Sequence, residues 1–328
     1  MILARYIFLS AIFLTFTTTA DITTASPDTE NNFSFNVISD IPYNREQEEL
    51  LVQEIIPALR SSDAPFTIHL GDFKAGDTVC SDSLFRKRQV QISQMHLKYV
   101  IYTPGDNEWT DCDRGGDSEI ERLAKIREMF FTNLPSFPDS WTPTRQEGFP
   151  ENFRWIYKNV AFSTVHIVGT NNGRIQIKED DIDEALQLVD ARDKANQTWT
   201  DTLFKAAANQ NAKAVLIALQ ADLSNSRYEG ECTPEKPRIC DGYFLVKKQL
   251  IQAAKDFKKP ILILHGDTGP YCMDKKFGGA DAPNLWRFNS GGDYRLLDAV
   301  KITVSPDDSL TPFSMESLRE HITPSAAC

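Results

Sequence analysis

Tyr102-Thr-Pro-Gly-Asp-Asn-Glu-Trp109 is the stretch of sequence that decides the fold. The apolar run Lys98-Tyr-Val-Ile-Tyr102 leads directly into it and has the β-branched and aromatic content of a buried strand. A proline and a glycine then end that strand. Asp106, Asn107 and Glu108 follow at its carboxyl end, where open α/β sheets bind their ligands. The stretch therefore predicts a strand that delivers polar side chains to a site.

Two other apolar runs also end in a carboxylate. They are Asn36-Val-Ile-Ser-Asp40 and Phe66-Thr-Ile-His-Leu-Gly-Asp72. Carboxylates that are brought together repel one another unless a positive charge lies between them, so three matching strand ends predict a cation site. The alternative is that these acids are ordinary turn residues, since Asp and Asn favour turns. The repetition at matching positions favours the site.

The amino terminus is typical of a secretory signal. Arg5 precedes the apolar core Tyr6–Phe16, which is too short for an ordinary transmembrane helix, and cleavage is expected near Ala20. The alternative is an uncleaved anchor. We expect a signal peptide over residues 1–20, a disordered lead-in over 21–32 and one domain over 33–328. No later stretch has the length and apolarity of a membrane span.

The net charge limits the classes of binding partner, and the cysteine content indicates the cellular compartment. The formal net charge is -11, which argues against nucleic acid or anionic membrane as the main partner. Six cysteines in an exported chain indicate disulfides. The sequence alone does not choose among the pairings. The pairing that we favour is Cys80 with Cys112, Cys232 with Cys240 and Cys272 with Cys328.

Periodicity predicts an α/β protein with two sheets and helices outside them. Helices are expected over 46–59, 83–95, 119–131, 179–209 and 243–257. The strands 153–157 and 161–168 form a hairpin through Lys158-Asn159. Buried strands over 214–220 and 260–264 end in Gln220 and in His265-Gly-Asp267, and shorter strands follow over 285–288 and 300–304. The tail after Pro306 shows no clear packing signal.

The ordered strand-end motifs resemble those of the calcineurin-like metallophosphoesterases over roughly residues 35–304. The family pattern is D-x-H, G-D, G-N-H-D/E, a lone H and G-H-x-H. The corresponding stretches are Asp40-Ile-Pro42, Gly71-Asp72, Gly105-Asp-Asn-Glu108, Gln220 and Gly266-Asp-Thr-Gly269. The resemblance implies a two-sheet metallophosphoesterase-like sandwich flanked by helices, in a divergent and exported branch of the family.

The resemblance also implies a changed metal site. Family members hold two metal ions, but Pro42 and Gly269 stand where the first site has histidines, so that site keeps only Asp40 and Asp72. The second site would consist of Asp72, Asp106, Gln220 and Asp267. Ligand sets made only of oxygen suit Mg²⁺, Mn²⁺ or Ca²⁺ better than zinc or iron. We therefore expect one hard divalent cation.

The catalytic histidine of the family is replaced by Asn107 in this chain. An asparagine cannot donate a proton to a leaving alkoxide. Asn107 and His265 would instead bind the phosphate or the leaving group, with His265 as the nearest substitute acid. The alternative for His265 is a structural residue bonded to a neighbouring carboxylate. His69 and His166 lie within apolar runs and are expected in the core.

Two functions follow from these expectations. The first is a metal-dependent phosphoester hydrolase, secreted or periplasmic, that acts on a phosphorylated small molecule or another phosphoester. The second is a catalytically inactive metallophosphoesterase-like binding protein, which the changes at Pro42, Asn107, Gln220 and Gly269 favour. The polar residues that remain at every strand end favour the hydrolase, because drift after loss of function would have replaced some of them with apolar residues.

Overall fold

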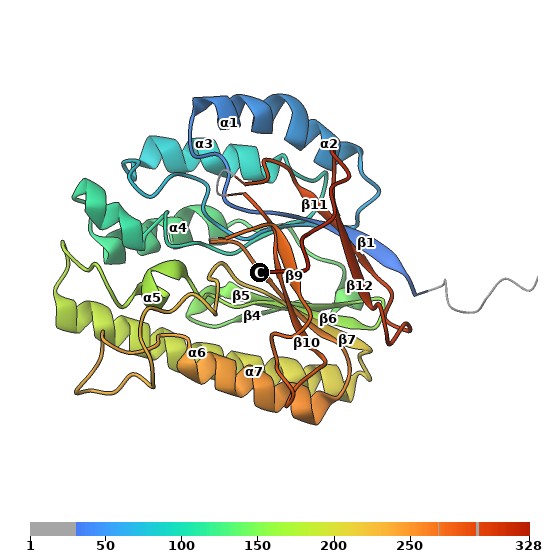
Figure 1. Cartoon of the computed structure of the whole chain (residues 1–328). Helices are drawn as coiled ribbons and strands as arrows, with labels where there is room; N and C mark the ends of the chain where they lie inside the picture. The colour runs from blue at the N-terminus through green and yellow to red at the C-terminus, as the bar shows by residue number, and fades with distance from the viewer. Residues whose placement is uncertain (1–30, 268, 293–294) are drawn as a thin grey trace, which may run out of the picture.

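Two mixed β-sheets pack face to face, with helices on both outer faces (Figure 1). The computed structural model describes residues 31–267, 269–292 and 295–328. The expected signal peptide and nearly all of the expected lead-in therefore lie outside the described residues. The two-sheet α/β architecture expected from the sequence is confirmed.

The first sheet has the strand order β12-β11-β1-β2-β3. Its strands are β1 (Phe33–Ile38), β2 (Thr67–His69), β3 (Val100–Tyr102), β11 (Val300–Val304) and β12 (Phe313–Ser317). The first three are parallel, and β11 and β12 are antiparallel additions. Strand β12 corrects the expectation that the tail carries no packing signal. Phe313 and Met315 are buried at alternate positions of a five-residue strand, a pattern too short to stand out.

The second sheet has the order β4-β5-β6-β7-β8-β10-β9. Its strands are β4 (Thr144–Gln146), β5 (Phe149–Tyr157), β6 (Val160–Thr164), β7 (Ala214–Ala218), β8 (Ile261–His265), β9 (Cys272–Asp274) and β10 (Leu285–Asn289). The central strands β6, β7, β8 and β10 are parallel. The predicted hairpin is present, and Lys158 and Asn159 adopt φ values of 45° and 60° in its turn.

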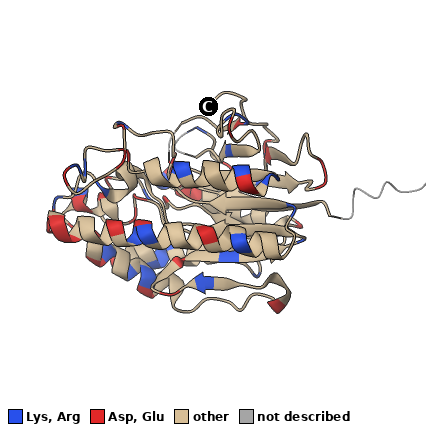
Figure 2. Ribbon diagram, turned by 90° about the horizontal axis from the view of Figure 1, so that it is seen from below, with Lys and Arg blue, Asp and Glu red and all other residues tan. Residues whose placement is uncertain are grey.

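The helices fall where periodicity predicts them. On the first sheet lie α1 (Arg45–Leu50), a π-helical turn (Leu51–Ile55), α2 (Ile56–Ser61), α3 (Asp82–Ser93) and α4 (Glu119–Phe131). On the second lie α6 (Ile182–Asn209) and α7 (Phe244–Phe257). Short helical turns cover Thr110–Gly115, Asp139–Trp141 and Gly169–Gly173, the last labelled α5. Basic and acidic residues are interspersed along the outer helices, as expected for solvated faces (Figure 2).

Aromatic side chains fill the space between the sheets. Phe66 packs edge-on against Trp155 with ring centroids 5.5 Å apart, and Trp155 stacks on Phe162 at 5.0 Å. All three are essentially inaccessible to solvent. Large buried aromatic rings contribute strongly to a core. This core fixes the two sheets against each other, so the carboxyl ends of their parallel strands share one rim.

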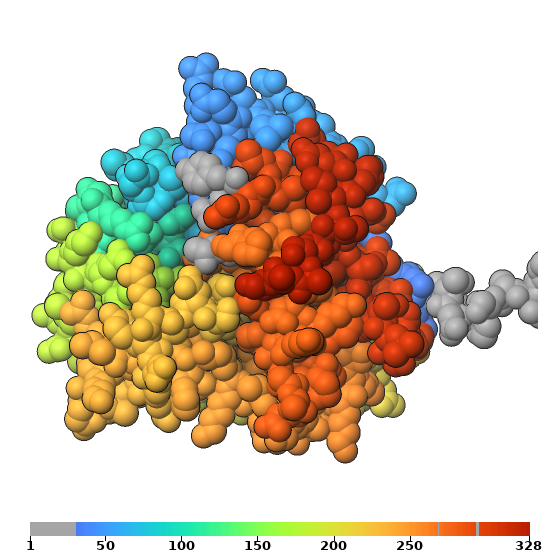
Figure 3. Space-filling model, in the orientation of Figure 1, coloured from blue at the N-terminus to red at the C-terminus, as the bar shows by residue number. Residues whose placement is uncertain are grey.

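Three disulfides have the pairing that we favoured. Cys80–Cys112, Cys232–Cys240 and Cys272–Cys328 have Cα–Cα distances of 5.6, 4.9 and 5.4 Å. The last of them holds the end of the tail, drawn red in Figure 3, against the orange β8–β9 region. Disulfides persist in oxidising compartments, so they fit an exported protein. None of the helices described here combines the length and apolarity needed to cross a bilayer.

Candidate metal centre

Three carboxylates converge where the two sheets meet. Asp72, Asp106 and Asp267 each place one oxygen so that the three atoms lie within 4.8 Å of one another. Asp72 and Asp106 follow strands β2 and β3 of the first sheet, and Asp267 follows β8 of the second. Asp72 is 2% exposed and Asp106 is 7% exposed. The packing of the sheets thus gathers three acids that are distant in sequence into one cluster, in which Asp72 and Asp106 are buried and Asp267 is partly buried.

A left-handed backbone turn recurs at three of the strand ends. Asp40, Asp72 and Asp267 have φ values of 56°, 58° and 75°. Such values are uncommon for residues other than glycine and are found mostly where surrounding contacts enforce them. The backbone N–H of Asp40 donates to the Gly71 carbonyl at 3.2 Å, and that of Asp267 donates to Asp40 Oδ2 at 3.2 Å. The same turn orients Asp40, Asp72 and Asp267, whereas Asp106 joins the cluster without it.

Two glycines leave the space that the acids occupy. A Cβ atom on Gly105 would lie 2.0 Å from Asp72 Oδ1, and a Cβ atom on Gly169 would lie 2.4 Å from Asp106 Oδ2. Neither distance is possible between real atoms without displacement of the loop. The backbones of the β3 and β6 loops can therefore approach the carboxylates only because these positions lack a side chain.

Glu108 holds the loops that carry the acids. Its carboxylate accepts hydrogen bonds from the backbone N–H groups of Asp72 at 2.9 Å and of Gly105 at 2.8 Å, and from the Tyr102 hydroxyl at 2.8 Å. The structure gives it backbone partners on two strand ends, so its role here is to join the β2 and β3 loops.

The side chain of Gln220, which we expected to supply an oxygen ligand, is oriented by a backbone hydrogen bond. Its side-chain oxygen accepts the backbone N–H of Gly169 at 2.6 Å. Only the amide oxygen can accept from an N–H group, so this bond fixes the orientation of the amide. The nitrogen of Gln220 consequently lies 3.0 Å from Asp72 Oδ2 and 3.1 Å from Asp106 Oδ1. Gln220 therefore donates to both acids, and the candidate ligands that remain are carboxylates.

Tyr43 lies between the two acids that the resemblance assigns to the first metal site. Its hydroxyl is 2.9 Å from Asp40 Oδ1 and 3.4 Å from Asp72 Oδ2. The side-chain amide of Asn107 donates to the same hydroxyl at 3.2 Å. A neutral donor thus contacts both Asp40 and Asp72. The position of Tyr43, three residues after Asp40, was the available sequence signal.

His265 is buried within the second sheet, at 1% exposure. Its Nδ1 lies 2.9 Å from the Gly266 carbonyl and its Nε2 lies 3.4 Å from the Arg287 guanidinium, which also forms an ion pair with Asp222. Burial lowers the pKa of the imidazole below its usual range. Its printed partners are therefore a backbone carbonyl and a guanidinium, and not the carboxylate of the structural alternative. His69 and His166 are buried as expected.

The electrostatics of the cluster favour a cation. Burial, followed by the charges of neighbouring acids, raises the pKa of Asp72 and of Asp267 well above the usual range. The buried Lys74 lies near the cluster, and its Nζ donates to the Ala75 carbonyl at 2.9 Å. Carboxylate oxygens are the donors that hard divalent cations prefer. The residues present therefore fit a single ion of this class.

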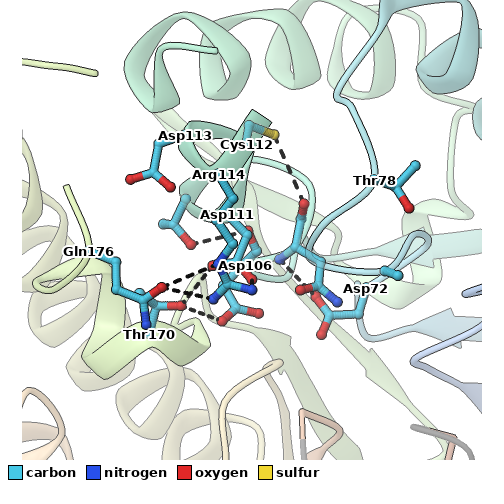
Figure 4. Close-up of polar contacts among 12 residues, drawn as sticks. Asp72, Thr78, Asp106, Asp111, Cys112, Asp113, Arg114, Thr170 and Gln176 are labelled. Carbon is cyan, nitrogen blue, oxygen red and sulfur yellow. Dashed lines mark hydrogen bonds and ion pairs between the residues drawn. The ribbon is translucent and has the colours of Figure 1, made fainter. Parts of the chain in front are cut away.

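A second layer of polar contacts connects Asp106 to the surface (Figure 4). Thr170 Oγ1 donates to Asp106 Oδ2 at 2.7 Å and lies 3.2 Å from Asp111 Oδ1. Asp111 forms an ion pair with Arg114 at 2.7 Å, and Arg114 donates to Gln176 Oε1 at 3.0 Å. Sequence reasoning missed Thr170, Asp111 and Arg114, although Thr170 follows a strand and the other two follow the central motif directly.

Comparison with solved structures identifies similar folds. The structure of PhoD aligns with a TM-score of 0.55 and 13% identity, covering 87% of this chain and 65% of that chain, so this chain spans about two thirds of its length. A structure described as GAP50, the anchor in the inner membrane complex of Plasmodium, aligns with a TM-score of 0.46 and 12% identity over 89% and 86% of the two chains. No protein-family model and no curated protein matches the sequence. The likeness to the PhoD structure shows that this chain has a metallophosphoesterase-like fold.

Proposed function

We propose that the protein is a metal-dependent phosphoester hydrolase of the calcineurin-like type, secreted or periplasmic, with one functional domain over residues 33–328. The observation that carries this proposal is the convergence of Asp72, Asp106 and Asp267 within 4.8 Å. Buried acids that repel one another are costly to a fold unless a cation neutralises them. Their presence at the shared strand ends, where such folds bind ligands, supports a functional site.

The site would hold one hard cation, Mg²⁺, Mn²⁺ or Ca²⁺, on Asp72, Asp106 and Asp267. Asp40 accepts hydrogen bonds from the Tyr43 hydroxyl and from the Asp267 backbone, which supports a place for Asp40 beside the ion rather than at a second ion. Gln220 stabilises the acids as a donor. When bound, the cation supplies positive charge that neutralises the acids and attracts the oxygens of a phosphoester.

Two side chains support the binding of a phosphoester in this proposal. Arg114 keeps 35% of its side chain exposed. A Cβ atom on Gly76 would lie 2.5 Å from Arg114 Nη1, 2.7 Å from Asp111 Oδ2, the ion-pair partner of Arg114, and 2.9 Å from Asn107 Oδ1, so all three groups approach the same glycine. A guanidinium matches phosphate geometry, and the amide of Asn107 can donate to a phosphoryl oxygen. We assign both residues to substrate binding and orientation.

The second candidate is a metal-binding protein without turnover. The specific observation that favours it is Asn107, whose amide donates to Tyr43 at 3.2 Å and cannot transfer a proton to a leaving group. Metal binding and hydrolysis must therefore be measured separately.

The test is elemental analysis of the mature protein after dialysis against Mg²⁺, Mn²⁺ and Ca²⁺, followed by assays with a phosphomonoester and a phosphodiester. We expect about one ion per chain and hydrolysis of at least one ester class. Asp72→Asn should lose both, whereas Asp281→Asn, a control whose side chain is 76% exposed, should keep both. Bound metal without hydrolysis would select the second candidate. Hydrolysis that survives Asp72→Asn unchanged would refute the metal account.

A further inference from the structure

The short helical turn α5 winds in the left-handed sense. Thr170, Asn171 and Asn172 have φ/ψ values of 54°/39°, 55°/46° and 59°/36°, and Gly173 has a φ of 73°. Asparagine and glycine tolerate this region of backbone space. A β-branched residue rarely adopts it, because its side chain crowds the backbone, so Thr170 is held in a strained conformation. Contacts from elsewhere in the fold must enforce that conformation.

Hydrogen bonds to the loop before α7 hold the turn. The side chain of Asn171 accepts the backbone N–H of Gly242 at 2.9 Å and donates to the Cys240 carbonyl at 3.0 Å. The backbone N–H of Asn172 donates to the Tyr243 hydroxyl at 3.2 Å. These contacts fix the two asparagines of the turn. The threonine before them therefore keeps a backbone conformation that its own residue type disfavours.

The hydroxyl of the strained residue contacts a candidate metal ligand. Thr170 Oγ1 donates to Asp106 Oδ2 at 2.7 Å (Figure 4), and the Gln220 amide donates to Asp106 Oδ1 at 3.1 Å. Each carboxylate oxygen has two acceptor positions, so both oxygens can still approach a cation. Donors from two different strand ends thus fix the plane of the Asp106 carboxylate.

The residue type at position 170 separates two roles for the turn. A position that only had to connect β6 to the next segment at a φ of 54° would suit glycine or asparagine, which adopt this backbone without strain. Threonine adds a hydroxyl donor on a short side chain with few rotamers. Strained residues cluster at functional sites, where the strain serves to place a group.

We propose that Thr170 is a positioning residue of the candidate metal centre, whose hydroxyl holds Asp106 in the orientation that binds the cation. The inference rests on the proposed function, because it assumes that Asp106 is a ligand. Loss of a group that orients a metal ligand typically weakens metal binding about tenfold to a hundredfold. The strain at Thr170 is thus the cost of a donor placed beside Asp106.

Calorimetric titration of the chelator-treated proteins with Mn²⁺ tests the proposal. Thr170→Ser keeps the hydroxyl and should bind Mn²⁺ within about threefold of the wild type. Thr170→Val, which has nearly the same shape, and Thr170→Gly both lack the hydroxyl and should bind at least about tenfold more weakly. Thr198→Val, at an exposed position of α6, is the control and should bind like the wild type.

Thermal melting of the same metal-free proteins separates positioning from a general effect on the fold. Thr170→Gly should melt at a higher temperature than Thr170→Val, because glycine adopts a φ of 54° without strain. The two variants should nevertheless bind Mn²⁺ equally weakly, since neither has the hydroxyl. Metal affinity that follows melting temperature across the series would overturn the proposal and show that the turn only supports the fold.

The remaining outcomes distinguish this proposal from the proposed function. If the wild type binds Mn²⁺ and the variants without the hydroxyl bind it equally well, the positioning role is wrong and the metal site stands. If the wild type binds no Mn²⁺, Mg²⁺ or Ca²⁺, the metal site is wrong and the positioning role is wrong with it. If Thr170→Val does not fold, the comparison of Thr170→Ser with Thr170→Gly decides, and equal affinity in these two would overturn the proposal.

Discussion

The Gly169 N–H and the Gln220 side-chain oxygen form a 2.6 Å hydrogen bond, which determines that the nitrogen end of the Gln220 amide faces the acid cluster. The bond turns the amide nitrogen of Gln220 toward Asp72 and Asp106. The position that the sequence would assign to a metal ligand therefore carries a donor, which reduces repulsion between the two acids before any ion binds.

Replacing Gln220 with glutamate should reverse that effect. Gln220→Glu puts a fourth carboxylate beside Asp72 and Asp106 and removes the donor, so the metal-free protein should lose on the order of 2 kcal/mol of stability. Added Mn²⁺ should then raise its melting temperature more than that of the wild type. Thermal scans with and without Mn²⁺ measure both effects. Gln187→Glu on the exposed face of α6 is the control, and an equal Mn²⁺ shift in all three proteins would contradict the prediction.

Removing the Tyr43 hydroxyl should change the number of bound ions. The hydroxyl lies 2.9 Å from Asp40 and 3.4 Å from Asp72. Tyr43→Phe leaves these acids with one donor fewer and should cost the metal-free protein about 1 kcal/mol. At high Mn²⁺, elemental analysis should find more than one ion per chain. Tyr228→Phe serves as the control, and an ion count of one in Tyr43→Phe would show that the hydroxyl does not replace a cation.

Glu119 should make stability depend on pH. Burial raises the folded-state pKa of this carboxyl to about 8, whereas an unfolded glutamate titrates near 4.3. A raised folded-state pKa contributes stability that is full below the unfolded pKa and is lost as pH rises to 8. Glu119→Gln should therefore be more stable than the wild type at pH 9, by an amount on the order of a few kcal/mol, and nearly equal at pH 4.

Urea unfolding of both proteins between pH 4 and pH 9 measures this difference. Glu128→Gln on the same helix, whose side chain is 67% exposed, should follow the wild type throughout. Parallel stability curves for the wild type and Glu119→Gln would show that Glu119 titrates normally.

The Cys80–Cys112 disulfide should matter more than Cys232–Cys240. It closes 32 residues and ties the loop after Asp72 to the turn after Asp106, whereas the other closes 8 residues. Loop entropy predicts losses of about 4 and 2.5 kcal/mol for the paired Cys→Ser variants. Only the first variant should also lose metal. Denaturant titration and elemental analysis test this, and normal metal content without Cys80–Cys112 would separate the bridge from the site.

The strand ends were predictable because their signals are local. Asp72, Asp106 and Asp267 each follow a short apolar run, and parallel strands deliver their carboxyl ends to one edge. The sequence alone therefore predicts that these acids lie close together. The short strand β12 was missed because only Phe313 and Met315 mark its buried face.

Other features depend on contacts that no local pattern records. The orientation of Gln220 comes from a backbone N–H on a different strand end. Thr170 reaches Asp106 from a turn in which Thr170, Asn171 and Asn172 all have positive φ, a conformation that asparagine tolerates but that a β-branched threonine rarely adopts. His265 faces Arg287 because β8 and β10 are neighbours, and strand order is a property of the whole sheet.

The tail has a consequence for association between molecules. Strand β9 lies at the edge of the second sheet, where unpaired backbone groups can template pairing with another chain. Ser325 occupies that edge, since its N–H donates to the Tyr271 carbonyl at 3.0 Å and its carbonyl accepts from Met273 N–H at 2.8 Å. The covalent link between Cys272 and Cys328 keeps this cover in place. Reduction of that link would expose a strand edge, so the bond protects the folded protein against aggregation as well as unfolding.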